Sequence, residues 1–422
     1  MTTEAAPSSP LAAADLLLPA GETPAKPGRD PVNLPMIRSW LEAMGDANPS
    51  YERTGTAPPA MIQVWTMRGL APPSADDPLQ VVSGACDRSG FGAVVATDSA
   101  QTYHRYLRVG EEVTVRSRLT SVVGPKRTSL GEGWFITTTT RWLVGDEPVA
   151  EMTFRILRYR PEKPPETPRA EPIRPVVTAD NTFFWDGVAA GELRLQRCGA
   201  CGALRHPPGP ACPDCGSVKP EYTVATGAGT IHSYVVHHHP PVPGRRAPYT
   251  IALVDLAEGV RMVAEYRGPR PEIGDPVRVA FDAGLPVWHP DVPTLDPWEL
   301  HVTPTLIIST ALATRDFQNV HHDRDAAVRL GGKDIFVNIL TTTGLVQRFV
   351  TDRLGPAIRI RSIRIRLGTP CHAYDTLTFT GQVFGDRVEV TGRTASGVHV
   401  TGTVEVAPPD GAGLSGDGAV AS

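Results

Sequence analysis

The feature that most constrains the fold of this chain is a segment that occurs twice. Residues 44–51 read Met-Gly-Asp-Ala-Asn-Pro-Ser-Tyr, and residues 314–321 read Thr-Arg-Asp-Phe-Gln-Asn-Val-His. Asp46 of the first segment matches Asp316 of the second, at an offset of 270 residues. Similarity at one offset indicates an internal repeat. A chain of 422 residues has room for two copies of a module and a further domain between them.

The two regions stay parallel beyond this segment. Gly69-Leu70 corresponds to Gly344-Leu345, where we expect an apolar helical stretch to end. Gly110-Glu111 corresponds to Tyr374-Asp375, and both pairs precede an expected strand. The offset stays near 270 residues. We therefore expect two copies of one module that flank a different domain.

The second copy has a carboxylate and an imidazole, Asp316 and His321, inside an otherwise apolar segment. Neighbours on one helical face are three or four residues apart, so a spacing of five brings the two side chains together only if the backbone leaves the helix between them. If they meet in a cleft, they can hold one water, and one group can take a proton while the other returns one. The competing interpretation is a buried polar contact that orders a loop.

The first copy has Tyr51 at the position of His321. A tyrosine hydroxyl, with a pKa of about 10, cannot replace an imidazole as a base at neutral pH. We therefore expect a reactive second copy and an inactive first copy. The cleft of the inactive copy is then free for other uses, and the small side chains of residues 57–60, Ala-Pro-Pro-Ala, would leave room for a large substrate.

This pattern resembles the MaoC-like hydratases of the hotdog fold, whose signature is Gly-Asp-x-Asn-Pro-x-His on an irregular segment beside a long central helix. The first copy matches the signature from Gly45 to Pro49. The second copy matches at Asp316, His321 and Asp323. It departs at Arg315, where Gly is usual, and at Gln318-Asn319, where Asn-Pro is usual.

The resemblance covers residues 31–160 and 300–407 and is strongest to the actinobacterial steroid side-chain hydratases. In that family a catalytic subunit pairs with a subunit that lacks the histidine, and the pair hydrates an α,β-unsaturated steroid acyl-CoA. The resemblance implies that both subunits are fused here, and that the substrate is a CoA thioester with no redox cofactor. A backbone N–H at the start of the central helix holds the thioester oxygen in the family. The matching positions here are Asn338 and Ile339, with Ile339 where Gly is usual.

Arginines and isoleucines alternate from Arg359 to Arg366, with a slip at Ser362. The alternation predicts a strand with one apolar face, and the slip predicts a bulge. For these arginines, Arg364 and Arg366 among them, a solvated charged face and a contact with the phosphates of CoA are equally supported.

Four of the six cysteines form two pairs, Cys198-x2-Cys201 and Cys212-x2-Cys215, ten residues apart. Each pair can place two thiolates on a tight turn, and four thiolates suit tetrahedral zinc. Two disulfides are the alternative, but paired two-residue spacing in a reducing compartment favours zinc. Because four protein ligands leave no open position, we expect the zinc to be structural.

Short strands with Gly and Pro between them follow the cysteines, and they predict a small closed barrel. The region resembles the zinc-ribbon plus OB-fold domains that accompany thiolases and acyl-CoA aldolases, over residues 175–290. Nucleic-acid binding would need a basic groove lined with aromatics. Residues 218–282 hold seven Lys or Arg against seven Asp or Glu, so we expect no nucleic-acid partner.

The resemblance of the middle region implies a thiolase-like aldolase as partner. Aromatic side chains often anchor such contacts. The candidates in this region are Tyr234, Tyr249 and Trp288.

Composition limits the remaining possibilities. The net charge of −4 gives no reason to expect an acidic membrane surface, and no apolar run approaches the roughly 20 residues of a membrane span. We expect a cytoplasmic homo-oligomer with reduced cysteines. Residues 1–30 are rich in Ala, Pro, Ser and Thr, and residues 408–422 in Gly, Ala and Ser, which predicts disorder at both ends.

The predicted fold class is α+β, with two hotdog domains that pack as a double hotdog and flank a zinc ribbon plus OB-fold β-barrel. The predicted boundaries are 31–165 for the degenerate hotdog, 175–290 for the ribbon and barrel, and 298–407 for the catalytic hotdog. The predicted function is hydration of a bulky enoyl-CoA. The alternative is a non-catalytic scaffold that recruits an acyl-CoA aldolase or thiolase through the ribbon and barrel.

Overall fold

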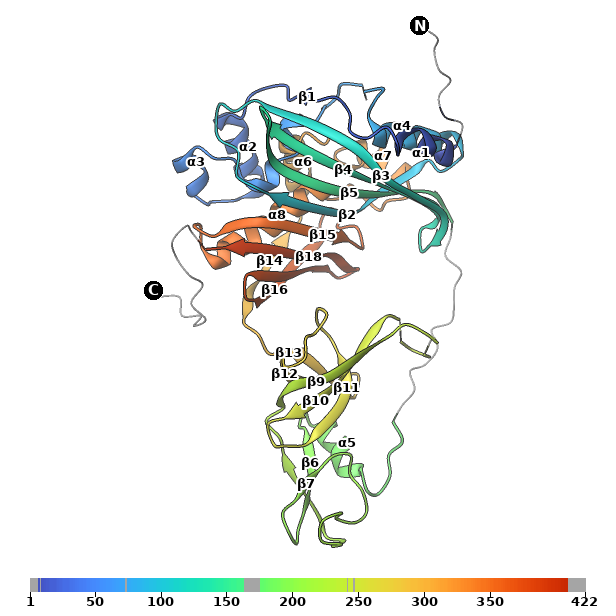
Figure 1. Cartoon of the computed structure of the whole chain (residues 1–422), viewed down its shortest axis with the longest axis vertical. Coiled ribbons are helices and arrows are strands. Elements are labelled where there is room, and N and C mark those ends of the chain that lie inside the picture. Colours follow the sequence, from blue (N-terminus) through green and yellow to red (C-terminus); the bar gives the residue numbers. More distant parts are fainter. Residues whose placement is uncertain are drawn as a thin grey trace. The chain divides into compact units, whose positions relative to one another are not determined.

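The computed structural model of the protein describes residues 7, 9–72, 74–162, 175–240, 242–245 and 247–408. The chain divides into two compact units, one formed by Met1–Pro165 with Thr294–Ser422, and one formed by Glu166–Pro293 (Figure 1). Among the described residues, no helix has both the length and the apolar character needed to cross a membrane.

The first unit contains both copies of the repeat. The elements of the first copy are α1 (Pro10–Leu17), β1 (Lys26–Pro27), α2 (Leu34–Met44), α3 (Ser50–Thr54), the 3-10 helices η1 (Pro59–Met61) and η2 (Val64–Thr66), α4 (Pro78–Arg88), β2 (Ala93–Tyr103), β3 (Val113–Thr128), β4 (Gly131–Val144) and β5 (Glu147–Pro161). Those of the second copy are β14 (Thr294–His301), α6 (Pro304–Ala313), the 3-10 helix η3 (Asn319–His321), α7 (Arg324–Arg329), α8 (Ile339–Leu354), β15 (Arg359–Leu367), β16 (Thr376–Phe384), β17 (Arg387–Thr394) and β18 (Gly397–Ala407).

One ten-stranded sheet runs through both copies, in the order β1-β3-β4-β5-β2-β15-β18-β17-β16-β14. The order reads the same from either edge when each strand is exchanged for its counterpart in the other copy. The copies join where β2 pairs antiparallel with β15, with Gln101 opposite Ile363 (Figure 1). The predicted double hotdog is therefore confirmed.

Equivalent turns support the repeat. Gly110 and Tyr374, which precede β3 and β16, both have positive φ, at 92° and 69°. Gly110 N–H donates to the Val32 carbonyl at 2.8 Å, and Tyr374 N–H donates to the Val302 carbonyl at 2.6 Å. The sequence match at these positions reflects the same local structure in both copies.

The main core of this unit is one cluster that includes residues of both copies, with α8 at its centre. Most of α8 is buried, including Leu345, Val346, Phe349 and Val350. A helix that is buried on nearly all sides packs against neighbours all round. Two of its contacts are with α2 and η1 of the first copy.

The expected equivalence of Gly69-Leu70 and Gly344-Leu345 is wrong. Gly344 lies inside α8, whereas Gly69 follows η2 in a turn and Leu70 is exposed. The short 3-10 helices η1 and η2 take the place of a long helix here, with Pro58 at the N-cap and Pro59 at the first position of η1. The following helix, α4, packs with α1, β3 and β4.

The expected disorder of residues 1–30 is wrong for residues 9–30. The Ser9 hydroxyl accepts the Ala12 N–H at 3.2 Å and so caps α1, and Ala13 and Ala14 are buried in a small cluster with residues of α4. β1 pairs with β3. The Ala- and Pro-rich composition concealed a short helix whose small side chains allow close packing. Residues 1–6, 8 and 409–422, for which disorder was also predicted, lie outside the described residues.

The second unit contains a ribbon and a barrel. Its elements are α5 (Thr182–Ala189), β6 (Arg194–Cys198), β7 (Leu204–Arg205), β8 (Pro220–Val224), β9 (Ala228–His237), β10 (Tyr249–Leu256), β11 (Arg261–Tyr266), β12 (Pro276–Asp282) and β13 (Leu285–Pro290). β7, β6 and β8 form a small sheet, and β10-β11-β13-β12-β9 form a closed barrel, which confirms the predicted architecture.

Candidate functional site

Asp316 is placed by the way in which α6 ends. Arg315 N–H donates to the Leu312 carbonyl and Asp316 N–H to the Ala311 carbonyl, both at 3.0 Å. This pair of bonds is a Schellman motif, which needs a left-handed residue just past the helix. Arg315 takes that conformation, with φ of 57°. The motif reverses the chain and directs Asp316 into the interior, where it is buried.

His321 lies at the end of η3 and is also buried. Its Nε2 is 3.6 Å from Asp316 Oδ2. The backbone therefore leaves the helix between the two residues and brings their side chains together, as predicted. At 3.6 Å the two atoms are too far apart for a good direct hydrogen bond. A water that contacts both fits such a separation.

The protonation of His321 follows from its surroundings. Nδ1 lies 2.7 Å from the Phe336 carbonyl oxygen, which can only accept a hydrogen, so Nδ1 carries the proton. Burial lowers the pKa of His321, and the nearby Asp316 opposes this shift. The imidazole is therefore held neutral, with the lone pair of Nε2 on the side of Asp316.

The first turn of α8 is joined to the end of α6 by Asn338. Its Oδ1 caps α8 by accepting the Thr341 N–H at 2.6 Å, and its Nδ2 donates to Thr314 Oγ1 at 3.1 Å. Thr314 directly precedes Arg315 and Asp316. The Asn338 side chain thus fixes the helix start relative to the acid, and Ile339 is the first residue of the helix.

Arg364 and Arg366 lie on β15, and a register shift between Ile360 and Ser362 confirms the predicted strand and bulge. Both arginines are exposed, and Arg364 Nη2 is 3.8 Å from Glu405 Oε1. Contact of these arginines with CoA stays a prediction.

Sequence reasoning missed two neighbours of the pair. The Phe336 ring lies edge-on to His321, with ring centroids 5.0 Å apart. Arg315 Nε donates to the Met67 carbonyl of the first copy at 3.3 Å. The arginine at a position where the family has Gly was the signal for this second contact.

The first copy repeats the helix end without the histidine. Gly45 has φ of 62°, and Asp46 N–H donates to the Leu41 carbonyl at 2.9 Å, so Asp46 is placed as Asp316 is. Asp46 and Tyr51 are both buried. Burial raises the pKa of the Tyr51 hydroxyl well above 10, which removes it further from use as a base.

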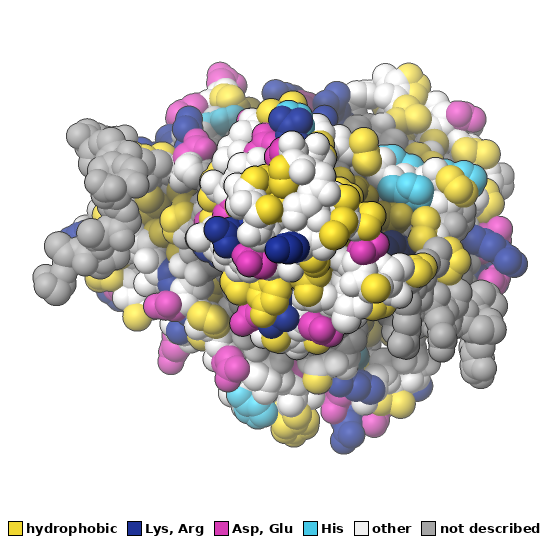
Figure 2. Space-filling model, turned by 90° about the horizontal axis from the view of Figure 1, so that it is seen from below, with side chains coloured by type: hydrophobic (Ala, Val, Ile, Leu, Met, Phe, Trp, Pro, Cys, Tyr) yellow, Lys and Arg dark blue, Asp and Glu magenta, His cyan; other side chains and the backbone are white. Residues whose placement is uncertain are grey.

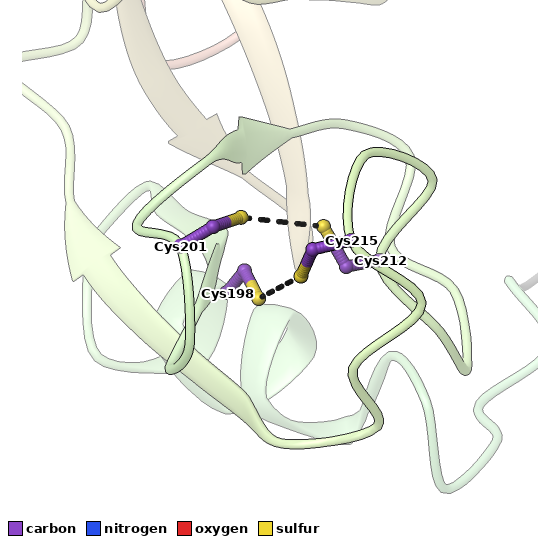
Figure 3. A group of neighbouring side chains, drawn as sticks. All are labelled: Cys198, Cys201, Cys212 and Cys215. Carbon is purple, nitrogen blue, oxygen red and sulfur yellow. Dashed lines mark hydrogen bonds between the residues drawn. The ribbon is translucent and has the colours of Figure 1, made fainter.

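The four predicted zinc ligands lie together in the second unit. The sulfurs of Cys198 and Cys215 are 3.6 Å apart, those of Cys201 and Cys212 are 3.7 Å apart, and all four lie within 4.8 Å of one another (Figure 3). Four sulfurs at tetrahedral corners about 2.3 Å from zinc are about 3.8 Å apart. A disulfide needs about 2.05 Å. All six cysteines are free, so the donor set fits zinc.

Two matching turns hold these cysteines. Gly202 N–H donates to the Cys198 carbonyl at 2.8 Å, and Gly216 N–H donates to the Cys212 carbonyl at 2.9 Å. Both glycines have positive φ, at 76° and 72°, which side chains disfavour. Backbone N–H groups of Cys201 and Ala200 lower the pKa of Cys198 to about 6, which favours the thiolate that metal needs.

The barrel corrects one expected partner contact. Trp288 is fully buried in the barrel core, so it cannot anchor another protein. The tryptophan lies on the inner side of β13. The outer face carries exposed Val235 and Val263, with Ile251 and Leu253 between them on β10. On the face shown in Figure 2, basic and acidic side chains are interspersed and hydrophobic ones lie among them.

Three family models match the chain. The model described as "FAS1-like, dehydratase domain region" matches residues 21–152. The model described as "ChsH2, rubredoxin-like zinc ribbon domain" matches residues 185–221, and "ChsH2, C-terminal OB-fold domain" matches residues 222–282. These matches agree with the fold and establish the second unit as a zinc-ribbon domain with its four cysteines.

Two proteins of Mycobacterium tuberculosis are close relatives. The chain is 50% identical over 294 residues to the "3-oxo-4,17-pregnadiene-20-carboxyl-CoA hydratase alpha subunit", a match that covers 64% of this chain and 94% of that protein. It is 60% identical over 117 residues to the corresponding "beta subunit", which covers 26% of this chain and 91% of that protein.

A solved structure supports the fold. The "MaoC-like dehydratase from Phytophthora Capsici" aligns with a TM-score of 0.52 and 14% identity over 94% of this chain and 98% of that one. At this identity the similarity establishes the fold alone. The two relatives show that the chain belongs to the MaoC-like enoyl-CoA hydratases, a family of hydro-lyases, and that it joins regions similar to an alpha and a beta subunit in one polypeptide.

Proposed function

We propose that this chain adds water across the α,β double bond of a bulky, steroid-derived acyl-CoA, with Asp316 and His321 as the reacting groups. The observation that supports this most is the buried approach of Nε2 and Oδ2 at 3.6 Å. A contact that only ordered a loop would favour a direct hydrogen bond. Two acceptors held apart favour a water between them, and the histidine is kept neutral.

The proposed reaction balances with one water. Its oxygen bonds to the β-carbon while Nε2 or Oδ2 takes one of its protons, and the electrons of the double bond move toward the thioester oxygen. The pair then returns that proton to the α-carbon, and the hydroxyl stays on the β-carbon. A backbone N–H at the start of α8, near Asn338 and Ile339, would stabilise the enolate oxygen.

The short helices of the first copy support the proposal that the acyl group is bulky. Because η1 and η2 stand in place of a long helix, the face of the first copy's sheet is covered by shorter elements. The alpha-subunit relative is named for a steroid-derived CoA thioester. The exposed Arg364 and Arg366 are our candidates for the phosphates of CoA.

We assign the second unit to docking a thiolase-like aldolase. Hydration produces a β-hydroxy thioester, which is the substrate that a retro-aldol cleavage needs, and tethering the two enzymes raises the local concentration of that product. Zinc held by four cysteines has no open position for chemistry. The apolar strip formed by Val235, Ile251, Leu253 and Val263 suits a protein contact.

Incubation of the full chain with enoyl-CoAs of increasing bulk, followed by mass spectrometry, tests the proposal. We expect a product heavier by one water, formed fastest from the bulky substrates. The scaffold alternative predicts no such product from any of them, together with binding of the aldolase.

A further inference from the structure

The vestigial site of the first copy, formed by Asp46, Tyr51 and Ala60, contains a side chain from the second copy. Gln347 projects from α8 and is fully buried. The Ala60 N–H donates to Gln347 Oε1 at 2.9 Å. Gln347 Nε2 then faces the Tyr51 hydroxyl at 3.1 Å and Asp46 Oδ2 at 3.5 Å.

These contacts fix the orientation of the amide. An N–H can only donate, so the Gln347 atom opposite Ala60 must be the oxygen. The amide NH2 therefore points to the acid and to the residue that replaces the histidine. A buried amide whose oxygen and nitrogen both find partners is favourable, whereas losing one partner is costly.

Equivalent bridges identify the position that the Gln347 oxygen occupies. Thr56 pairs with Arg108 in the first copy, as Phe336 pairs with His372 in the second. Residues 57–60 thus correspond to residues 337–340, the start of α8. By this correspondence the Ala60 N–H is the counterpart of the Leu340 N–H, one residue beyond Ile339. The counterparts of Asn338 and Ile339 are Pro58 and Pro59, which have no N–H to offer a thioester oxygen.

We propose that Gln347 closes the first copy's acyl-CoA subsite at the counterpart of the start of α8, and that this closed subsite anchors α8 for the reaction in the second copy. The inference rests on the proposed hydratase function. Gln347 is a positioning residue, since it lies eight residues beyond Ile339, about 12 Å along the helix. The adjacent Arg348 donates to the Met44 carbonyl at 2.8 Å and strengthens the same anchor.

The anchor explains why Asp46 persists beside a missing histidine. Its carboxylate no longer needs a catalytic partner, because it now accepts from Gln347 and from the Asn48 N–H at 3.0 Å. The closed subsite also limits each chain to one acyl-CoA. The earlier expectation that the first cleft is free for the substrate is wrong for this part of the cleft, because Gln347 fills it.

A double-mutant cycle on the full chain tests the anchor. In Gln347→Glu the oxygen still accepts from Ala60, but the second carboxylate oxygen replaces the donor and faces Asp46. We expect kcat for enoyl-CoA hydration to fall about tenfold with KM changed less than about twofold, because a displaced helix start misplaces the oxyanion donor. Adding Asp46→Asn restores a donor opposite the introduced carboxylate, and kcat should return to within about threefold of wild type.

The matched control is Gln80→Glu, which makes the same change on α4, near a helix N-terminus that tolerates an acid. Gln347→Met, which keeps the volume and removes the bonds, covers the case in which Gln347→Glu does not fold. Wild-type kcat in Gln347→Glu or Gln347→Met would overturn the anchor, as would an additive loss in the double variant. If the wild-type chain hydrates no enoyl-CoA, the proposed function fails, and the same cycle measured by unfolding midpoints still decides the anchor.

Discussion

The two repeated segments of this protein end equivalent helices in the same way but keep different side chains. Asp46 and Asp316 both follow a Schellman motif and are both buried. Five residues later the first copy has Tyr51 and the second has His321. The comparison teaches that the backbone conformation that positions an acid can be retained after its catalytic partner has been lost.

The helices that follow these segments differ more than the segments themselves. The second copy has the long α8, and the first copy has only η1 and η2 before α4. Side chains of α8 and its cap nonetheless contact both segments, through Asn338 in the second copy and Gln347 in the first. One helix therefore serves both copies, and this makes the inactive copy a structural support for the active one.

The largest expected effect separates the two copies directly. His321→Ala should lower hydration by about 100-fold or more, the usual contribution of a positioned acid or base. Tyr51→Phe should leave the rate nearly intact, because Gln347 keeps its bond to Ala60. Steady-state kinetics on an enoyl-CoA would check both variants. Equal losses would refute the distinction between a live and a vestigial site.

The next largest expected effect comes from Arg315, the residue before Asp316, whose counterpart before Asp46 is Gly45. Arg315 adopts a conformation that costs about 1–2 kcal/mol for a residue with a side chain. Arg315→Gly should relieve this cost and raise Tm by roughly 2–4 °C. It should also lower kcat by about tenfold, because the segment loses its contact with Met67. Calorimetry and kinetics would measure the two changes. A variant that is less stable, or as active as wild type, would contradict this role.

The pH dependence sharpens the account of the live copy. Since the pKa of His321 is lowered by burial, the neutral imidazole persists below pH 6.5. The acid limb of kcat/KM should therefore lie below pH 6.5. His321 binds a proton near pH 6.5 in the unfolded chain but only at lower pH in the folded chain. The neutral imidazole therefore contributes stability that is present above pH 6.5 and is lost as pH falls through the folded pKa. An acid limb above pH 6.5 would show that His321 is not held neutral.

The smallest expected effect on hydration comes from the metal. The purified chain should contain one zinc, and stripping it should unfold the second unit, because ligand binding and folding of such ribbons are coupled. The hydration rate should change by less than about twofold, since the zinc ligands belong to the other unit. Metal analysis, circular dichroism and kinetics on one sample would check this. Disulfides found by mass mapping, without zinc, would contradict the assignment.

Local patterns predicted much of this structure. The cysteine spacing predicted the four-sulfur cluster, and the alternation of Arg and Ile predicted β15 and its bulge. The spacing of Asp316 and His321 predicted a break in the helix. In each case the residues that determine the feature lie close to it in the sequence, so one short segment is enough to predict it.

The features that sequence reasoning missed depend on distant contacts. Gln347 and Tyr51 are separated by 296 positions, and nothing near either residue indicates that they meet. Trp288 was named as a candidate anchor because it is aromatic, but residue type does not say which side of a barrel strand faces inward. α1 was missed because low-complexity composition outweighed its short apolar stretch.

The most direct test of the central claim is the number of acyl-CoA sites per chain. Isothermal titration of the full chain with a saturated, unreactive analogue of the preferred enoyl-CoA would count them. A live second copy and a first copy closed by Gln347 predict one site per chain, and His321→Ala should retain it. Two sites per chain would contradict the account, because the first copy would then bind the thioester as the second does.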